Sequence, residues 1–458
     1  MKAMTLDTVV AAVHGQLIRG TGEHSVARVS HDSRKAGEGD LFFAIIGDRF
    51  DGHDFISRAA ENGCRSFIIS HTRWIQEGEA EGLDLILVED TRKALQELAA
   101  WSVRDMGLLT IGITGSTGKT STKDMMYYVC SQKYKTGRTL GNFNNDIGMP
   151  LTVLSFPEDT EAAVLEMGMD HFGEIDTLAR IARPRIALIT NIGISHMENL
   201  GSREGIMKAK MEITNYFDEN STLIISTGKD LLRRENIRGS YRLVTTGTEE
   251  TDDYVIAGVR DAEDGGISFT MHHGGDEQAF HLPVPGRHNA LNAALAVAAG
   301  ELLGIPMRQA ADALRHMTLT GGRLTMKKNK DLLIIDDTYN ASPDSMHSAV
   351  DVLSSVKGKR HIAIFGDMYE LGKDSPSWHR EVGAYAASKD VEAVYAIGDE
   401  ARYIALGAGE KGSYFASKQA FCEDLRRRIG RNAAVLVKGS RGMAMEEIVA
   451  ALVDMERE

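Results

Sequence analysis

The segment Gly115-Ser-Thr-Gly-Lys-Thr-Ser121 constrains the fold of this chain more than any other stretch. An apolar run, Leu109 to Ile113, precedes it, and a helix-like stretch follows. Glycines let a backbone fold closely around phosphate oxygens, and the N–H groups at a helix start face an anion. A strand, a tight turn and a helix in this order predict a phosphate-binding loop in a parallel α/β sheet. The alternative is a glycine-rich turn with an exposed lysine.

Each residue type in this loop suits nucleotide binding. We expect Lys119 to neutralise the β- and γ-phosphates and the hydroxyl of Thr120 to hold Mg²⁺. The usual loop has a glycine five residues before its Gly-Lys pair, where this chain has Ile113. The loop alone does not separate hydrolysis, kinase chemistry and ligation. The predicted nucleotide-binding residues of the loop are Gly115, Ser116, Thr117, Gly118, Lys119, Thr120 and Ser121.

The chain is too long for one compact core, at 458 residues. We expect an α/β protein of three domains, with boundaries at residues 1–106, 107–318 and 319–458. Apolar strand-like runs alternate with helical segments in the second and third blocks, which predicts parallel sheets covered on both faces. Between residues 255 and 281 the pattern changes to short alternating strands, which predicts a hairpin appendage.

Charge and cysteine content exclude several classes of protein. The net charge of -13 argues against broad binding of nucleic acid or of an anionic membrane, although a site can be locally basic. The three cysteines, Cys64, Cys130 and Cys422, show no CxxC spacing, so neither a disulfide framework nor a zinc site is expected. No run of about 18 apolar residues occurs, which predicts a cytoplasmic protein without membrane insertion.

Polar residues follow two further apolar runs. Glu166 ends one strand-like run, and Asn191 and His196 follow another. Because the carboxyl ends of parallel strands face one crevice, Glu166 is expected to meet the Mg²⁺ held at Thr120. The alternatives are ordinary ones: a surface glutamate, a structural histidine and, for Lys210, a solvated helical side chain.

These motifs together resemble the Mur ligase superfamily. Its members carry TG-x-x-GK-[ST], then TN-x₄-H, then an A-K pair about a dozen residues later, and this chain matches all three. The resemblance implies that the lysine of the pair is carbamylated by CO₂ and helps to hold a second Mg²⁺. It implies catalytic roles for Lys119, Glu166, His196 and Lys210, and metal ligation by Thr120, Glu166, His196 and Lys210.

The first block resembles the UDP-binding module of the MurE and MurF types. The similarity lies in the stretch from Ser30 to Phe55, which contains DSR, GDLF and DGH-F. A charged surface loop is the alternative. A later segment resembles the N-N-x-x-G-x-P motif, with Asp146 where many members have glutamate. The implied UDP-substrate residues are Ser33, Arg34, Arg49, His53, Asn144 and Asn145.

The third block resembles the MurF type, the UDP-N-acetylmuramoyl-tripeptide–D-alanyl-D-alanine ligases. The chain lacks the D-N-P-R motif of the MurE type and has DDTYNASPDSM, FGDMYELG and KGSR. The resemblance implies a Rossmann-like C-terminal domain. Asp337 could instead end a strand and cap a turn, and Asn289 and Asn292 could cap a helix rather than face adenine. The implied ATP contacts are Asn289, Asn292, Arg323, Asp337 and Asn340, and those near D-Ala-D-Ala are Lys438, Ser440 and Arg441.

The resemblance implies a monomeric ligase of peptidoglycan synthesis. It would use ATP and two Mg²⁺ ions to join D-Ala-D-Ala to UDP-N-acetylmuramoyl-tripeptide through an acyl phosphate. The nearest rivals are a MurE-type ligase, disfavoured by the missing D-N-P-R motif, and folylpolyglutamate synthase, disfavoured by the UDP-type first block. A P-loop hydrolase would turn over ATP without an amine. A non-enzymatic nucleotide-binding scaffold is the third rival.

Overall fold

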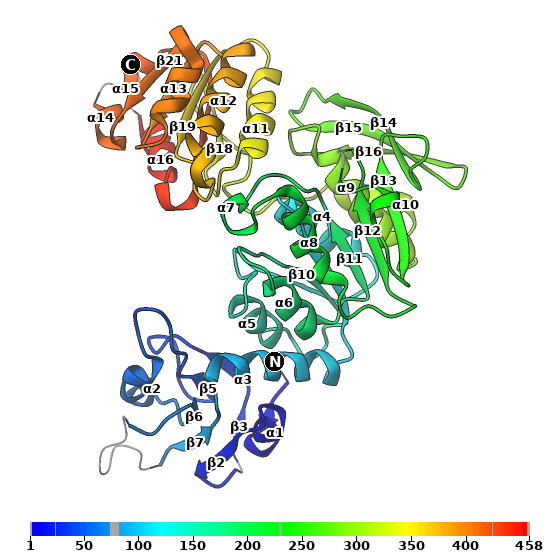
Figure 1. The fold of residues 1–458 in the computed structure, drawn as a ribbon, viewed down its shortest axis with the longest axis vertical. Helices are drawn as coiled ribbons and strands as arrows, with labels where there is room; N and C mark the ends of the chain where they lie inside the picture. Colours follow the sequence, from blue (N-terminus) through cyan, green and yellow to red (C-terminus); the bar gives the residue numbers. More distant parts are fainter. Residues whose placement is uncertain (1, 23, 74–81, 229–230, 424, 456–458) are drawn as a thin grey trace.

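The chain forms three units that follow one another along the sequence and along the long axis of the molecule (Figure 1). The computed structural model describes residues 2–22, 24–73, 82–228, 231–423 and 425–455. In these ranges no helix has the length and the apolar character that a membrane crossing requires. The expectation of an α/β fold in three units is confirmed.

The N-terminal unit is built on a five-stranded sheet in the order β2-β7-β6-β5-β4. Strands β4, β5, β6 and β7 pair in parallel, and β2 pairs with β7 in the antiparallel sense. All side chains of β5 and β6 are buried, which is why these strands have continuous apolar sequences. The elements are β1 (Met4–Thr5), α1 (Leu6–Ala12), β2 (Gln16–Arg19), β3 (Ser25–Val26), β4 (Arg28–Ser30), β5 (Asp40–Phe43), η1 (Gly52–Phe55), α2 (Ile56–Glu61), β6 (Ser66–Ile69), β7 (Asp84–Leu87) and α3 (Thr91–Asp105).

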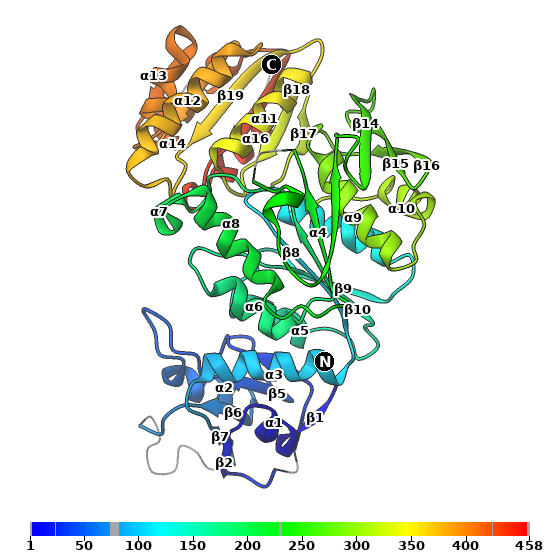
Figure 2. The same ribbon diagram turned by 45° about the vertical axis from the view of Figure 1, so that its right-hand side comes forward.

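Helix α3 joins the N-terminal unit to the central unit. Asp90 caps its start by accepting hydrogen bonds from the N–H groups of Arg92 and Lys93. One side of the helix packs against β5 and β6, and another side packs against α5 and α6 of the central unit (Figure 2). The helix is therefore buried between two units, and it fixes the N-terminal sheet beneath the central one.

The central unit contains a nine-stranded sheet in the order β16-β15-β14-β13-β12-β11-β8-β10-β9. The strands are parallel from β9 to β14, and β14, β15 and β16 are antiparallel. The segment expected to be a separate hairpin thus extends this sheet. The elements are β8 (Leu109–Thr114), α4 (Lys119–Cys130), β9 (Thr136–Arg138), α5 (Gly148–Leu154), β10 (Ala162–Glu166), α6 (Glu174–Ala182), β11 (Ile186–Ile189), α7 (Met197–Leu200), α8 (Arg203–Met211), η2 (Glu212–Thr214), β12 (Thr222–Ser226), η3 (Arg234–Asn236), β13 (Arg242–Gly247), β14 (Tyr254–Asp261), β15 (Ile267–His273), β16 (Asp276–Leu282), α9 (Asn289–Leu302) and α10 (Met307–Leu314).

Both faces of the central sheet are covered by helices. Along β10, Ala163 and Leu165 belong to the core shared with α3, α5, α6 and α8. The intervening Ala162 and Val164 belong to the core shared with α4, α9 and α10. Side chains alternate between the faces of a strand, so a strand buried on both faces needs apolar residues throughout. This packing leaves the loops at the strand ends as the accessible edge of the sheet.

The C-terminal unit repeats the same architecture with a six-stranded sheet, β17-β18-β22-β19-β20-β21. Only β17 is antiparallel to its neighbour. Helices α11, α12 and α13 cover one face, and α14, α15 and α16 cover the other. The elements are β17 (Thr325–Asn329), β18 (Leu332–Asp337), α11 (Pro343–Ser355), β19 (Arg360–Gly366), η4 (Gly372–Asp374), α12 (Ser375–Ser388), β20 (Ala393–Ile397), α13 (Arg402–Ala408), η5 (Gly409–Lys411), β21 (Gly412–Phe415), α14 (Lys418–Cys422), α15 (Leu425–Ile429), β22 (Ala433–Lys438), η6 (Arg441–Met443) and α16 (Glu446–Asp454).

Candidate active site

A cleft of about 750 Å³ lies between the central and C-terminal units. Its central wall comes from the segments that follow β8, β10 and β11, and its other wall from those that follow β18, β19 and β22. Ligands of open parallel sheets bind outside the carboxyl ends of the strands, and here two such edges face one another. Most of the residues that the sequence singled out in these two units line this cleft.

The phosphate loop lies between β8 and α4, as predicted. Gly115 and Gly118 have φ values of +151° and +79°, a region that favours glycine. A Cβ atom at Gly115 would lie 1.8 Å from the hydroxyl oxygen of Thr190, and one at Gly118 would lie 2.6 Å from Oδ1 of Asn292. Both positions therefore require glycine for conformation and for space.

The loop is held by the segment that follows β11. The N–H of Thr117 donates to Oδ1 of Asn191 at 3.1 Å, and Nδ2 of Asn191 donates to the Thr117 hydroxyl at 2.9 Å. The N–H of Gly193 donates to the Ser116 hydroxyl at 2.8 Å. Asn191 therefore positions the phosphate loop, a role that the sequence did not reveal beyond its place after a strand.

Lys119 lies at the first position of α4 and folds over the loop. Its ammonium group donates to the carbonyl oxygens of Gly115 at 2.8 Å and of Ser116 at 3.3 Å. Burial lowers the pKa of Lys119, while the nearby carboxylate of Glu166 opposes this shift. The side chain thus places its amino group beside the backbone N–H groups that can enclose an anion.

Glu166 links the phosphate loop to the segment that follows β9. The Thr120 hydroxyl donates to Oε2 of Glu166 at 2.7 Å, and Nδ2 of Asn144 donates to Oε1 at 2.9 Å. Glu166 and Thr120 are both buried. The neighbouring Asn145 lines the cleft and also accepts a hydrogen bond from the Gly148 N–H at the start of α5. A carboxylate and a hydroxyl in contact form a pair of hard oxygen ligands, which fits Mg²⁺.

His196 lies between two carboxylates from different parts of the chain. Its Nδ1 atom is 3.0 Å from Oδ1 of Asp170 and 2.6 Å from Oε2 of Glu370. Burial lowers the pKa of His196, but the two carboxylates outweigh burial and raise it above the usual value. The sequence did not single out either carboxylate, although Glu370 belongs to the quoted FGDMYELG segment.

Lys210 is buried in α8 and is not among the residues that line the cleft. Burial lowers its pKa well below the usual value, and the charge of Lys119 contributes to this shift. Within the described ranges, no hydrogen bond or ion pair of the Lys210 ammonium is found. The energetic cost of a buried unpaired cation favours the neutral amine.

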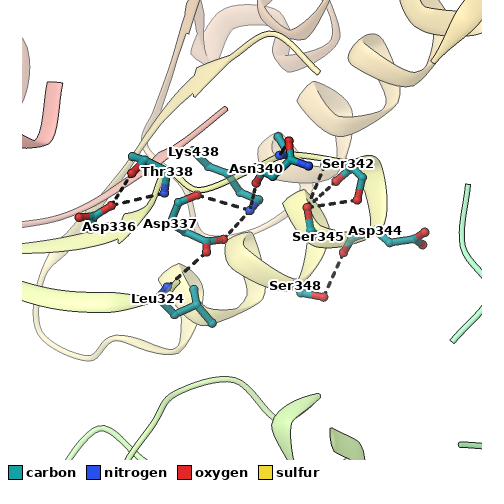
Figure 3. Close-up of polar contacts among 11 residues, drawn as sticks. Leu324, Asp336, Asp337, Thr338, Asn340, Ser342, Asp344, Ser345, Ser348 and Lys438 are labelled. Carbon is teal, nitrogen blue, oxygen red and sulfur yellow. Dashed lines mark hydrogen bonds and ion pairs between the residues drawn. The ribbon is translucent and has the colours of Figure 1, made fainter. Parts of the chain in front are cut away.

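An ion pair between Asp337 and Lys438 lies in the C-terminal wall of the cleft. Nζ of Lys438 donates to Oδ2 of Asp337 at 2.6 Å and to the carbonyl oxygen of Asn340 at 2.7 Å (Figure 3). Asp337 and Lys438 are register partners at the ends of the parallel strands β18 and β22. Oδ1 of Asp337 accepts a hydrogen bond from the Leu324 N–H at 3.2 Å. The two predicted residues are thus partners of one another within the cleft.

Asp344 was not singled out in the sequence, yet it lies at the contact between the units. Figure 3 shows its side chain pointing away from the Asp337–Lys438 pair, from the first turn of α11. A Cβ atom at Gly193 would lie 2.3 Å from Oδ2 of Asp344. Glycine at this position therefore lets the two walls of the cleft approach closely.

Three further candidates line the C-terminal wall. The guanidinium group of Arg323 lies 3.9 Å from the ring centre of Tyr339, a cation–π contact. The hydroxyl of Ser440 accepts a hydrogen bond from the N–H of Tyr369 at 2.9 Å. Arg441 is exposed and pairs with Glu446 at 2.7 Å. All three line the cleft.

The two asparagines at the start of α9 have different environments. Asn289 is fully buried and donates to the carbonyl oxygen of Pro285 at 2.8 Å, and it is not among the cleft residues. Asn292 lines the cleft, and its Nδ2 donates to Oδ1 of Asn289 at 3.0 Å. Asn292 can therefore meet a ligand, whereas Asn289 supports it from behind.

The four candidates of the N-terminal unit, Ser33, Arg34, Arg49 and His53, do not line this cleft. Arg34 is exposed and makes two hydrogen bonds to Asp32, both at 2.8 Å. Arg49 is exposed. Ser33 is buried, and its carbonyl oxygen accepts a hydrogen bond from the side chain of Asn62. The four residues share one unit but are not joined by contacts to the phosphate loop.

The side chain of His53 is completely buried in a cluster with Asp51 and His71. Its Nδ1 atom lies 2.5 Å from Oδ1 of Asp51, and its Nε2 accepts a hydrogen bond from the Ser70 N–H at 3.0 Å. The rings of His53 and His71 are stacked with centres 3.9 Å apart. Burial lowers the pKa of His53, although the hydrogen bond to Asp51 and the charge of Asp51 oppose this shift.

Three family models match: the Mur ligase family, catalytic domain, over residues 25–102; the Mur ligase middle domain over residues 113–300; and the Mur ligase, glutamate ligase domain, over residues 322–441. The UDP-N-acetylmuramoyl-tripeptide–D-alanyl-D-alanine ligase of Bacillus subtilis is 40% identical, with 98% of each chain covered.

Solved structures agree with the sequence relatives. A crystal structure of MurF from Acinetobacter baumannii has a TM-score of 0.92 at 31% identity, covering 99% of this chain and all of the other. The MurF ligase from Thermotoga maritima in complex with ADP has a TM-score of 0.83 at 30% identity, covering 93% of this chain and 97% of the other. The similarity thus extends over all three units.

Proposed function

The chain belongs to the Mur ligase family, and from this premise we propose that it joins D-Ala-D-Ala to UDP-N-acetylmuramoyl-tripeptide with cleavage of ATP to ADP and phosphate. The observation that carries the proposal is the double contact of Glu166. This carboxylate contacts Thr120 of the phosphate loop and Asn144 of the segment expected to face the UDP substrate. It therefore links the nucleotide side of the cleft to the acceptor side. The product would be the UDP-pentapeptide precursor of peptidoglycan.

The proposed reaction first activates a carboxylate. A free carboxylate resists attack by an amine, because an oxide would have to leave. Transfer of the γ-phosphoryl group from ATP to the terminal carboxylate of the tripeptide gives an acyl phosphate and ADP. The α-amine of D-Ala-D-Ala then attacks the acyl carbon, phosphate leaves, and the amine loses a proton as the amide forms.

The chain supplies position and positive charge for the phosphoryl transfer, which depends mainly on these two factors. The N–H groups at the start of α4 and the ammonium group of Lys119 face the phosphates. Thr120 and Glu166 would hold one Mg²⁺, whose charge offsets the negative charge that develops on the phosphoryl group. The contact between their oxygen atoms supports this assignment.

Lys210 fits the site only if it is modified. As an ammonium group it would repel a second Mg²⁺, but its buried amine has a lowered pKa. A neutral amine attacks CO₂ and releases one proton, which gives a carbamate with a negative charge. We propose that carbamylated Lys210 and His196 hold the second Mg²⁺, since oxygen ligands suit this ion.

The remaining assignments follow the order of the units. Residues 1–106, with Ser33, Arg34, Arg49 and His53, would bind the UDP part of the acceptor, helped by Asn144 and Asn145 of the central unit. Residues 107–318 would bind ATP. Residues 319–458 would contribute ATP contacts at the end of β18 and bind D-Ala-D-Ala near the end of β22. We expect a monomer acting in the cytoplasm, where ATP is available.

The test measures phosphate release with ATP, Mg²⁺ and UDP-N-acetylmuramoyl-tripeptide, with and without D-Ala-D-Ala. Release that requires the dipeptide, together with UDP-pentapeptide detected by mass, supports the proposal. Release that is indifferent to both substrates would favour a P-loop hydrolase. A strong preference for a single amino acid over the dipeptide would favour another ligase of the family.

A further inference from the structure

Two carboxylates from different units converge on one nitrogen atom of His196. Asp170 follows β10 in the central unit, and Glu370 follows β19 in the C-terminal unit. Their oxygen atoms lie 3.0 Å and 2.6 Å from the same Nδ1 atom. One ligand atom from each of the three side chains lies within 4.8 Å of the other two.

This arrangement is not a satisfied hydrogen-bond network. An imidazole nitrogen carries at most one proton, so Nδ1 can donate fully to only one of the two carboxylates. Within the described part of the chain, Nδ1 of His196 has no well-aligned hydrogen-bond partner despite these short distances. Two carboxylates that share one histidine repel one another. An imidazole nitrogen and two carboxylate oxygens together form a ligand set for a divalent cation.

The backbone around Glu370 is held by contacts of the residues on both sides of it. The N–H of the preceding Tyr369 donates to the hydroxyl of Ser440 at 2.9 Å, and the following Leu371 is buried in the C-terminal core. A Cβ atom at Gly372 would lie 3.4 Å from Cβ of Glu198, so this segment packs against α7, which begins directly after His196. Glu370 is therefore a fixed part of the C-terminal unit that touches the central unit at His196.

We propose that Glu370, together with Asp170, is a ligand of the divalent cation held at His196, and that Glu370 completes this site only when the C-terminal unit is seated on the central unit. The inference rests on the proposed function, in which a second Mg²⁺ belongs to the site. It adds a ligand from the C-terminal unit to residues that otherwise all lie in the central unit.

Such a ligand couples metal binding to domain closure. By linkage, a cation that binds more tightly to the closed arrangement must favour closure by the same factor. The second cation would then be fully bound only when the cleft is shut, and an acyl phosphate formed there would be protected from water. The contact thereby gives the enzyme a means to delay phosphoryl transfer until both units are in place.

The experiment compares the wild type with Glu370→Gln, which keeps the size of the side chain and removes its charge. Mn²⁺ binding is measured by electron paramagnetic resonance in bicarbonate buffer without nucleotide, and the radius of gyration by X-ray scattering with and without Mg²⁺. We expect the Mn²⁺ site at His196 to lose about tenfold or more in affinity, as is usual when a group that supports a metal site is removed. We also expect Mg²⁺ to reduce the radius of the wild type but not of the variant.

Two further variants make the result specific. Glu410→Gln removes an exposed charge elsewhere in the C-terminal unit and is expected to match the wild type in both measurements. Asp170→Asn is expected to weaken Mn²⁺ binding as Glu370→Gln does. Wild-type Mn²⁺ affinity in Glu370→Gln would overturn the proposal. The proposal would also fail if the radius of gyration changed equally in the wild type and in Glu370→Gln at every Mg²⁺ concentration, because Glu370 would then form only a salt bridge with His196.

These measurements use neither peptide substrate nor turnover. Failure of the ligase assay would therefore leave the metal result intact, and failure of the metal result would leave a ligase whose C-terminal unit supplies no metal ligand. A thermal melt of each variant confirms that the chain is folded.

Discussion

The hydroxyl of Thr120 donates a 2.7 Å hydrogen bond to the buried carboxylate of Glu166. The first residue belongs to the phosphate loop and the second ends the neighbouring parallel strand, where β10 pairs with β8. This contact places a hydroxyl and a carboxylate side by side, so that both can bind the same cation. Four expected outcomes follow from this and related contacts.

Removing the charge of Glu166 is expected to impair catalysis with little effect on folding. Glu166→Gln keeps an oxygen for the Thr120 hydroxyl but loses the carboxylate that we propose as a Mg²⁺ ligand, so we expect kcat to fall by about 10²-fold or more. Titration of ADP formation against Mg²⁺ checks this, because the half-saturating Mg²⁺ concentration is also expected to rise. The control is Glu158→Gln, an exposed glutamate in the loop before β10. An unchanged Mg²⁺ dependence in Glu166→Gln would remove this residue from the metal site.

Lys210 is expected to form a carbamate that its exposed neighbour does not form. Burial lowers the pKa of Lys210 well below its usual value and so favours the neutral amine that reacts with CO₂, whereas Lys208 is exposed. In ¹³C-labelled bicarbonate we expect a carbamate carbonyl signal that disappears in Lys210→Arg and persists in Lys208→Arg. Activity should disappear with the signal. A fully active Lys210→Arg variant would contradict the assignment.

Asp337 and Lys438 are expected to stabilise the C-terminal unit only when both charges are present, so removing one charge should be more harmful than removing both. Asp337→Asn leaves a buried ammonium group without its carboxylate, which costs about 3–5 kcal/mol in the free energy of unfolding. The double variant Asp337→Leu with Lys438→Met should recover most of this loss, because it removes both charges. Urea unfolding measures each change. The exposed pair of Lys135 and Asp159 is the control, since water screens this pair and breaking it should have little effect on stability.

Acidification is expected to destabilise the N-terminal unit through His53. Its pKa is lowered by burial, so the unfolded chain binds a proton at a higher pH than the folded chain does. The contribution of His53 to the free energy of unfolding is therefore fully present above the ordinary histidine pKa of about 6.5. It decreases as the pH drops below this value, by up to about 1.4 kcal/mol per pH unit. Asp51, with a pKa lowered to about 2, adds a further loss only in stronger acid.

Thermal melts between pH 7.5 and 5 check this prediction. His53→Gln does not titrate, so its melting temperature should depend less on pH over this interval than that of the wild type. His316→Gln replaces an exposed histidine and should follow the wild type. An identical pH dependence in all three proteins would show that His53 does not control the acid response.

Parts of the fold and site with local causes could be predicted from the sequence. The glycines, Lys119 and Thr120 of the loop act within a few residues of one another, and their spacing predicts strand, turn and helix. The contact of Glu166 with Thr120 was predictable as well, because parallel strands place their carboxyl ends at one edge. Strands β8, β10 and β11 were predicted as well, because their apolar runs are typical of strands that are covered on both faces.

Other features depend on which segments become neighbours, and the tertiary structure alone decided them. The alternating pattern of β14, β15 and β16 predicts strands but does not state which sheet they join, since alternation describes only the faces of a strand. The sequence likewise presents Asn289 and Asn292 as equivalent; packing of α9 buries both, and of the two Asn292 lines the cleft.

The order of residues along the chain specifies the chemical groups of the site: a phosphate loop, a carboxylate at a strand end, and a histidine and a lysine that follow it. The tertiary structure decided which of these groups meet. The approach of Glu370 to His196 and the pairing of Asp337 with Lys438 join residues that are far apart in the chain. Such contacts depend on the order of the strands in a sheet and on how two units pack. The spacing of residues along the chain indicates neither of these features.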